Sequence, residues 1–171
     1  LADALLLPVL CAVLAPALWR VPQRLYRLLP PILLVLAGAN MQHLAGLLTQ
    51  DPTLAQRGLH TGIYALMLLY VLVGGLQTPI FTGNALRQRG RGEQARFVPI
   101  LELAAVVAIV LLAVLDLLDA PPSWTGATAL ISAAVIGLRT ARWHGWRVLD
   151  DTLLWPMHLG FVFLTLALLL R

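Results

Sequence analysis

The chain has 171 residues, of which 60% are hydrophobic and only 12% are charged, and its mean hydropathy is +0.85. Soluble domains carry about 25% charged residues, so this chain lacks the polar surface that would cover a water-soluble core. The net charge of +4 comes from twelve basic residues that are all arginine, and their grouping between apolar runs, with no continuous basic face, argues against a nucleic-acid partner.

Six long apolar runs follow one another along the sequence. They cover residues 4–19, 28–48, 58–81, 97–118, 124–138 and 153–170. A transmembrane helix needs about 20 apolar residues, with a range of about 17–25; the first run approaches this length with residues 1–3, and the fifth extends to Thr140. We therefore expect an all-α fold, a polytopic membrane helix bundle of about six transmembrane helices that forms a single membrane domain over residues 1–171 in a lipid bilayer.

The arginines indicate how the runs are oriented. Ten of the twelve fall in alternate connections, which are those after the first, third and fifth runs. Cytoplasmic loops of membrane proteins carry such an excess of basic residues, so these arginine-rich loops are predicted to be cytoplasmic and the first residue to lie outside. Trp124 is expected at the outer interface, and Trp143 and Trp146 at the inner one, as in an aromatic belt.

The second and third runs carry polar residues near the predicted outer surface. Asn40 and His43 are three residues apart, on one face of the second run. His60 opens the third run. Ionisable groups inside the membrane are candidates for functional sites, so His43 and His60 are predicted to share an outer-leaflet metal site. The alternative is that each imidazole is hydrogen-bonded to a neighbouring helix.

The end of the third run has an unusual composition for a helix in lipid. Two glycines are followed by a proline and then by polar residues that can recap freed backbone groups or line a polar cavity. We expect a functional helix break on the inner side, and the alternative is a kink that serves packing alone. The segment comprises Gly74, Gly75, Pro79, Phe81, Thr82 and Asn84.

The fourth and sixth runs add Glu102 and His158, both on the inner side. With Thr82 and Asn84 they are predicted to share an inner site, although Glu102 has the alternative of pairing with a loop arginine. A spanning run is about 30 Å long, so His43 and His158 are not expected to ligate one ion. The sequence has no nucleophile–base pair, nucleotide loop or zinc motif, and we name no catalytic residue.

Four stretches together resemble the NnrS family of bacterial membrane proteins. The order and spacing agree along almost the whole chain. The family's arginine after Gly-Gly is Leu76 here, and its tyrosine after Leu-Gly is Phe161. The four stretches are Ala-Asn-Met-Gln-His-Leu at 39–44, Gly-Gly to Leu at 74–86, Arg-Trp-His-Gly-Trp-Arg at 142–147 and Leu-Leu-Trp-Pro-Met-His-Leu-Gly-Phe at 153–161.

The resemblance implies a multi-pass protein of the bacterial inner membrane with a role in nitric-oxide response during denitrification or nitrosative stress. It also implies haem and copper as cofactors, and it makes His43 and His158 the candidate cofactor ligands, with His60 a further candidate for metal. Family members are about twice as long, with roughly twelve helices. The chain is therefore expected to be a middle fragment whose partners are the remaining helices of the parent protein.

Two other functions fit the same residues. A broken helix at 74–84 would suit part of a small-solute transporter or channel, because discontinuous helices with polar ends form transporter binding sites. Against this, the sequence shows no convincing internal repeat. The small residues of the second run would also suit a structural module in a larger complex.

Overall fold

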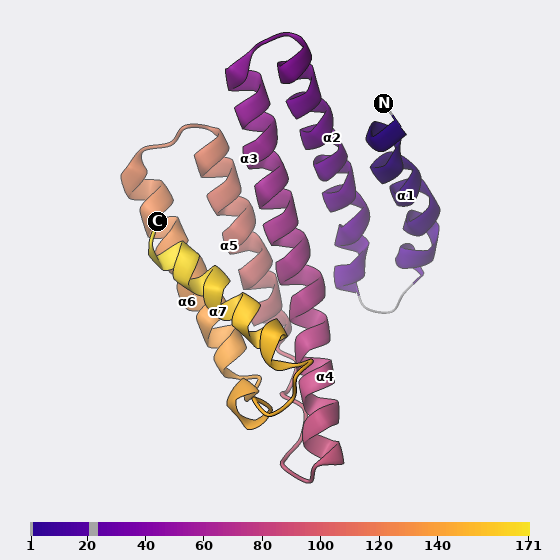
Figure 1. Ribbon diagram of the computed structural model, residues 1–171. Coiled ribbons are helices and arrows are strands. Elements are labelled where there is room, and N and C mark those ends of the chain that lie inside the picture. Colours follow the sequence, from indigo (N-terminus) through magenta and orange to yellow (C-terminus); the bar gives the residue numbers. More distant parts are fainter. Residues whose placement is uncertain (1, 21–23) are drawn as a thin grey trace. The chain divides into compact units, whose positions relative to one another are not determined.

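The computed structural model describes residues 2–20 and 24–171, and these residues form helices and connections without strands (Figure 1). The prediction that the chain begins on the outer side of the membrane concerns Leu1, which is not among the described residues. The helices are α1 (Ala2–Trp19), α2 (Leu29–Leu48), α3 (Pro52–Leu69), α4 (Gly75–Gln88), α5 (Pro99–Leu117), α6 (Pro122–Ala141) and α7 (Trp155–Leu169), with short helical turns at Arg24–Leu28, Tyr70–Gly74 and Gly145–Arg147.

The all-helical membrane fold is confirmed, and five of the six predicted runs agree with single helices to within a few residues. The third run is longer than predicted, because α3, a π-helical turn and α4 follow one another without a break from Pro52 to Gln88. Three stretches of the described chain are long and apolar enough to cross a membrane, and two shorter helices are also apolar. The three are Tyr26–Leu48, Pro52–Gln88 and Pro99–Leu117.

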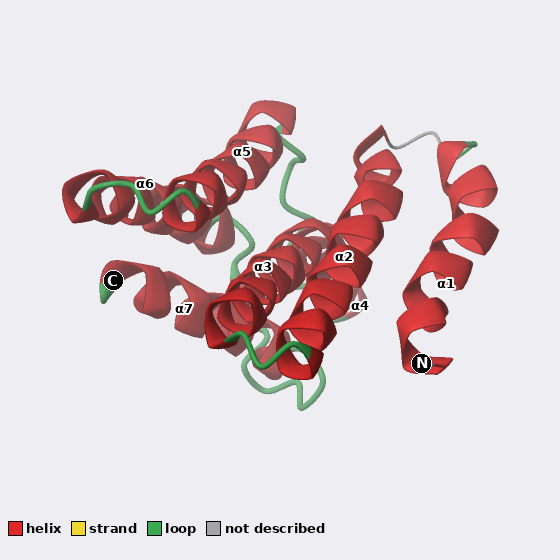
Figure 2. Ribbon diagram, turned by 90° about the horizontal axis from the view of Figure 1, so that it is seen from above, coloured by secondary structure: helices red, strands yellow, loops and turns green. Residues whose placement is uncertain are grey.

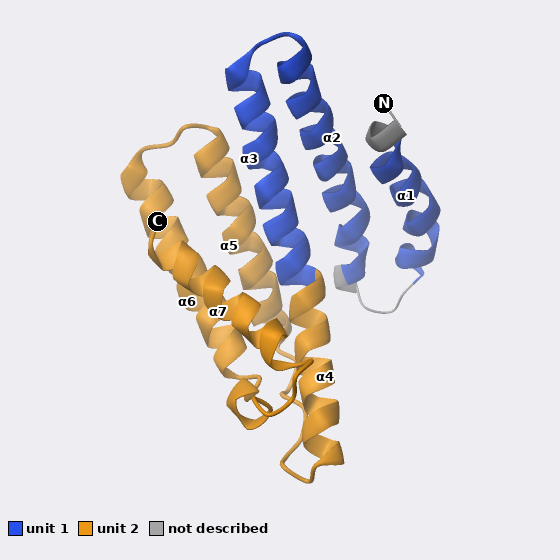
Figure 3. Cartoon of the chain, in the orientation of Figure 1, with its two compact units in different colours: residues 1–72 blue, residues 73–171 orange. Residues whose placement is uncertain are grey.

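The first compact unit, residues 1–72, contains α1, α2 and α3 (Figure 3). The α2–α3 hairpin is held closely together by small residues, as expected from the composition of the second run. A Cβ atom added to Gly46 would lie 2.7 Å from Cα of Ala55, and one added to Gly58 would lie 2.9 Å from Cα of His43. The backbones therefore approach to distances that only glycine permits at these two positions.

The second unit, residues 73–171, contains α4 to α7. Here α5 and α6 form an antiparallel hairpin, and α7 packs against α6 (Figure 2). On α5, Ile109 and Leu112 are fully buried, whereas Val107 and Leu111 are about half exposed. A helix that is hydrophobic all round is buried in a core or in a membrane, so the exposed apolar face of α5 is a surface for lipid.

The predicted helix break does not occur where it was expected. The helix continues through Pro79 to Gln88, and its irregular part is the π-helical turn at Tyr70–Gly74. Proline removes one backbone hydrogen bond and crowds the carbonyl four residues earlier, which is the carbonyl of Gly75. A π turn has a wider hydrogen-bonding pattern than an α-helix, and here it ends directly before Gly75.

Candidate functional site

In the first unit, His43 and Asn40 line a pocket between α2 and α3. The pocket has a volume of about 330 Å³ and is otherwise lined mainly by apolar and small residues, among them Gly58 and Gly62. Nδ1 of His43 lies 2.8 Å from the carbonyl oxygen of Ala55. A carbonyl only accepts hydrogen bonds, so Nδ1 carries a proton and Nε2 is left as the nitrogen available to a ligand.

His60 does not join this arrangement. Its side chain is exposed, and it is not among the residues that line the pocket. The sequence left open the alternative that His43 only forms a hydrogen bond to a neighbouring helix, and this bond is present. The same bond leaves Nε2 without the proton that Nδ1 carries, so that Nε2 can act as a ligand. Imidazoles that bind metals almost always donate their other N–H to a carbonyl or carboxylate, which fixes the tautomer.

In the second unit, four helices bring polar side chains into a buried cluster. Arg139 of α6 donates from Nε to Oε1 of Glu102 on α5 at 3.0 Å and also pairs through its terminal nitrogen with Oε2. The two side chains are only 2% and 8% exposed. Glu102 is therefore paired with an arginine, as its alternative interpretation held, but this arginine is buried in the last turn of α6 and is not a loop residue.

Gly75 of α4 makes room for this ion pair. A Cβ atom at position 75 would overlap the guanidinium group of Arg139. The residue directly after the two glycines, Leu76, is apolar and buried. The positive charge next to Gly75 therefore comes from Arg139 of α6.

A second buried pair joins α4 to α7. The hydroxyl group of Thr82 and Nε2 of His158 share a hydrogen bond of 2.9 Å. Because this bond occupies Nε2, His158 would have to give it up to ligate a metal through that nitrogen. Thr82 and His158 are thus brought together as predicted, but the pair is structurally satisfied without an ion.

Trp143 links the two pairs. Its ring meets the ring of His158 edge-on at 6.2 Å and that of Phe161 at 4.9 Å, and the guanidinium carbon of Arg139 lies 5.5 Å from its centroid. Trp143 is therefore packed inside the protein, at 4% exposure, and its predicted depth at the inner interface stays a prediction. Ser132, Ile136 and Arg139 share one buried face of α6, and Trp143 follows in the turn after the end of that helix.

Two residues of the predicted helix break are exposed, whereas Thr78, which the prediction did not include, is buried. Thr78 is fully buried, and its hydroxyl oxygen has no hydrogen-bond partner among the described residues. Phe81 and Asn84 are exposed, and the Asn84 side-chain oxygen accepts a bond of 2.8 Å from Arg87. Asn84 therefore does not join Glu102 and His158 in a common site, contrary to prediction.

The described residues contain no group of three histidine, cysteine or acidic side chains that could hold a metal ion. A single imidazole with a free Nε2, facing a mostly apolar pocket, matches the single proximal histidine that holds haem iron in globins and peroxidases. It does not match a copper site, which needs several convergent ligands. His43 thus offers one imidazole nitrogen to a ligand in this pocket.

Comparison with known proteins identifies one family. The sequence model of the family described as "NnrS protein" matches residues 1–171, which is the whole chain. Neither a curated protein nor a solved structure matches the chain significantly.

Proposed function

The chain belongs to the NnrS family, and from this premise we propose that it is an integral protein of a bacterial inner membrane that acts in the response to nitric oxide through a haem ligated by His43. The apolar helices and the arginine-rich connections support the membrane position, with those connections on the cytoplasmic side. The family resemblance supports the role in nitrosative stress and denitrification.

The observation that carries the proposal is the hydrogen bond from Nδ1 of His43 to the carbonyl of Ala55. This bond fixes the imidazole tautomer and orients Nε2, so that the ring needs little reorganisation to act as a ligand. Asn40, one turn away on the same helix, places an amide in the same pocket. Haem iron, when bound, supplies a coordination position for a small diatomic molecule such as nitric oxide.

The close approach of α2 to α3 is part of this arrangement. Gly58 brings the backbone of α3 against His43, and the acceptor at Ala55 lies one turn earlier on the same helix. The tautomer of His43 therefore depends on the packing of the hairpin. His158, whose Nε2 is already bonded to Thr82, is the weaker candidate, and copper would need further ligands beyond either histidine.

The transporter alternative rests on an irregular helix at 74–84, where a π-helical turn ends at Gly74 and an α-helix runs on from Gly75; it stays an alternative. The structural-module alternative accounts for the closely packed α2–α3 hairpin and for the hydrogen bond from His43 to Ala55, but it gives no role to the pocket that His43 lines. We therefore take haem ligation as the better supported function.

Replacement of His43 by glycine tests the proposal. The full chain is purified in detergent, incubated with haem and examined by absorption and electron paramagnetic resonance spectroscopy. We expect His43→Gly to lose the spectrum of histidine-ligated haem and added imidazole to restore it, because free imidazole can enter the space left by the side chain.

His60→Ala is the matched control, since His60 is an exposed histidine outside the pocket. It is expected to bind haem like the parent protein. Equal haem spectra for the parent protein, His43→Gly and His60→Ala would overturn the assignment of His43.

A further inference from the structure

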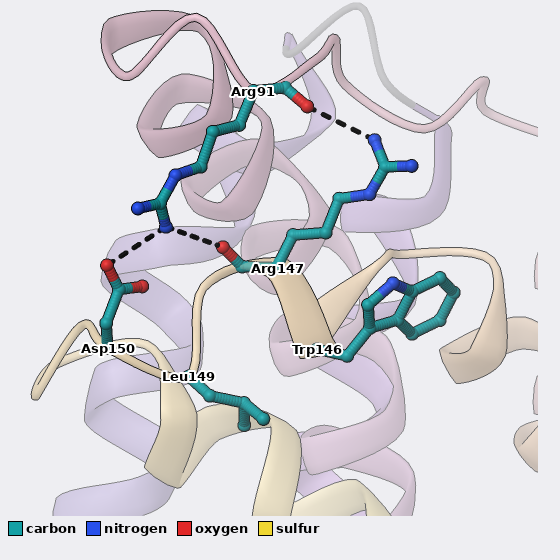
Figure 4. A pocket seen from close by; sticks show the side chains of 5 residues that line it. All are labelled: Arg91, Trp146, Arg147, Leu149 and Asp150. Carbon is teal, nitrogen blue, oxygen red and sulfur yellow. Dashed lines mark hydrogen bonds and ion pairs between the residues drawn. The ribbon is translucent and has the colours of Figure 1, made fainter.

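The connection between α6 and α7 forms a cavity with the connection that follows α4. The cavity has a volume of about 580 Å³ and is lined by Arg91, Trp146, Arg147, Leu149 and Asp150 (Figure 4). The guanidinium group of Arg91 donates to the carbonyl of Arg147 at 3.3 Å, and that of Arg147 donates to the carbonyl of Arg91 at 3.1 Å. These reciprocal bonds fix both arginines at the cavity.

The charges around this cavity do not cancel. Arg89 pairs with Asp150 and Asp151 at 2.8 Å each, and Arg91 pairs with Asp150 at 3.0 Å. Arg147 has a backbone carbonyl as its partner and no carboxylate among the described residues. The cavity lining itself holds two guanidinium groups, of Arg91 and Arg147, and one carboxylate, of Asp150. One positive charge therefore remains in the lining, and most of the N–H donors of Arg147 are free.

An apolar groove adjoins the charged cavity. It has a volume of about 410 Å³, follows α6 and α7, and shares Trp146 and Leu149 with the charged cavity. Along α7 its lining runs from His158 through Val162 to Leu166. These nine residues, with eight steps of rise between the first and the last, span about 12 Å, which is the length of about half or more of a fatty acyl chain.

The side chains where the two cavities meet are typical of a membrane interface. Trp146 and Leu149 are 60% and 63% exposed, and tryptophan is enriched where lipid headgroups meet the hydrocarbon core. A cation on one side and an apolar groove on the other, joined at an interfacial tryptophan, match the charge and polarity of an anionic phospholipid.

We propose that the two cavities form one binding site for an anionic phospholipid. Arg147 binds the phosphate group, with Arg91 held beside it, and an acyl chain lies in the groove between α6 and α7. Because Asp150 is neutralised by Arg89 and Arg91, its carboxylate does not repel the headgroup. The site is separate from the His43 pocket and does not depend on haem.

Lipid titration of the full chain in detergent, read by native mass spectrometry, tests the proposal. The probes are phosphatidylglycerol and phosphatidylcholine with the same palmitoyl and oleoyl chains. We expect the chain to bind phosphatidylglycerol about fivefold more tightly, which corresponds to about 1 kcal/mol for one basic residue at an anionic headgroup. Arg147→Gln is expected to abolish this preference.

Arg142→Gln is the control for net charge, because Arg142 is exposed and lines neither cavity. Gly137→Leu tests the groove. A Cβ atom at position 137 meets only Thr165 at 3.5 Å, so the added side chain fills the groove and should weaken the binding of both lipids several-fold.

A titration with inorganic phosphate distinguishes a lipid from a free anion. Binding of phosphate as tight as that of phosphatidylglycerol would overturn the lipid assignment. Equal losses in Arg147→Gln and Arg142→Gln, or equal affinities of the parent protein for the two lipids, would also overturn it.

Discussion

Arg139 and Glu102 form an ion pair in which both side chains are almost completely buried. The pair joins α5 to α6, and it is enclosed by Gly75 on one side and by the ring of Trp143 on another. Burying two charges costs desolvation energy that their attraction need not fully offset. The pair therefore specifies how these helices meet, and its effect on stability appears when one partner is removed.

Loss of one charge should destabilise the second unit more than loss of both. Glu102→Leu or Arg139→Met alone leaves a buried charge without its partner, and we expect a cost of about 3–5 kcal/mol in the free energy of unfolding. The double variant should recover most of this cost. Unfolding in mixed micelles, followed by circular dichroism, completes the double-mutant cycle; additive losses would show that the charges do not act as a pair.

Gly75→Ala should be destabilising although alanine is the better helix former. The new Cβ atom would overlap the guanidinium group of Arg139, and overpacking a core costs about 1–3 kcal/mol. Gly126→Ala on α6 is the matched control, because no atom lies within 4 Å of a Cβ there. That control should gain stability by up to about 1 kcal/mol from helix propensity. Equal effects in the two variants would argue against the close packing of Arg139 on Gly75.

The helices were predictable from the sequence because apolar length and arginine spacing decide them locally. Burial of Arg139 and Trp143 was not, because a charge and an indole near a helix end are ordinarily assigned to the surface. Their inward orientation depends on Glu102, which is 37 residues away from Arg139 in the sequence. Pairing of Thr82 with His158, by contrast, followed from their similar predicted depth.

The irregular segment shows what composition leaves undetermined. Two glycines and a proline indicate that the helical hydrogen bonding is weakened in this segment, but they do not determine which turn of the helix deforms. Here the π turn lies at Tyr70–Gly74, and Pro79 stays inside a regular helix. Directly after this turn, Gly75 packs against Arg139 of α6, a contact that the composition of the segment does not indicate.

Removal of the Thr82 hydroxyl should leave His158 with an unsatisfied ring nitrogen. Thr82→Val keeps the shape of the side chain and loses the bond of 2.9 Å, so we expect a loss of about 1–3 kcal/mol. Thr82→Ser keeps the hydroxyl and should lose less. Nitrogen-15 NMR of the His158 ring measures the bond directly, and an unchanged Nε2 resonance in Thr82→Val would contradict it.

The start of α3 should weaken in acid because of Asp51. The hydroxyl group of Thr53 and the amides of Leu54 and Thr53 donate hydrogen bonds to this carboxylate and hold its pKa below the ordinary value of 3.8. A lowered pKa in the folded state means that the contribution to stability is complete above the unfolded-state pKa. This contribution is lost as the pH falls through the lower, folded-state value.

Hydrogen exchange at the amides of Thr53 and Leu54 measures this loss, because both donate to Asp51 at 3.0 and 3.1 Å. Asp51→Asn is the control at each pH, since asparagine caps helices as well as aspartate but does not titrate. The ratio of the two proteins' exchange rates removes the intrinsic pH dependence of exchange. We expect the parent protein to lose protection relative to Asp51→Asn only below about pH 5, where an aspartate with the ordinary pKa begins to bind protons. A ratio that stays constant from pH 7 to pH 3 would mean that the charge on Asp51 does not stabilise the start of α3.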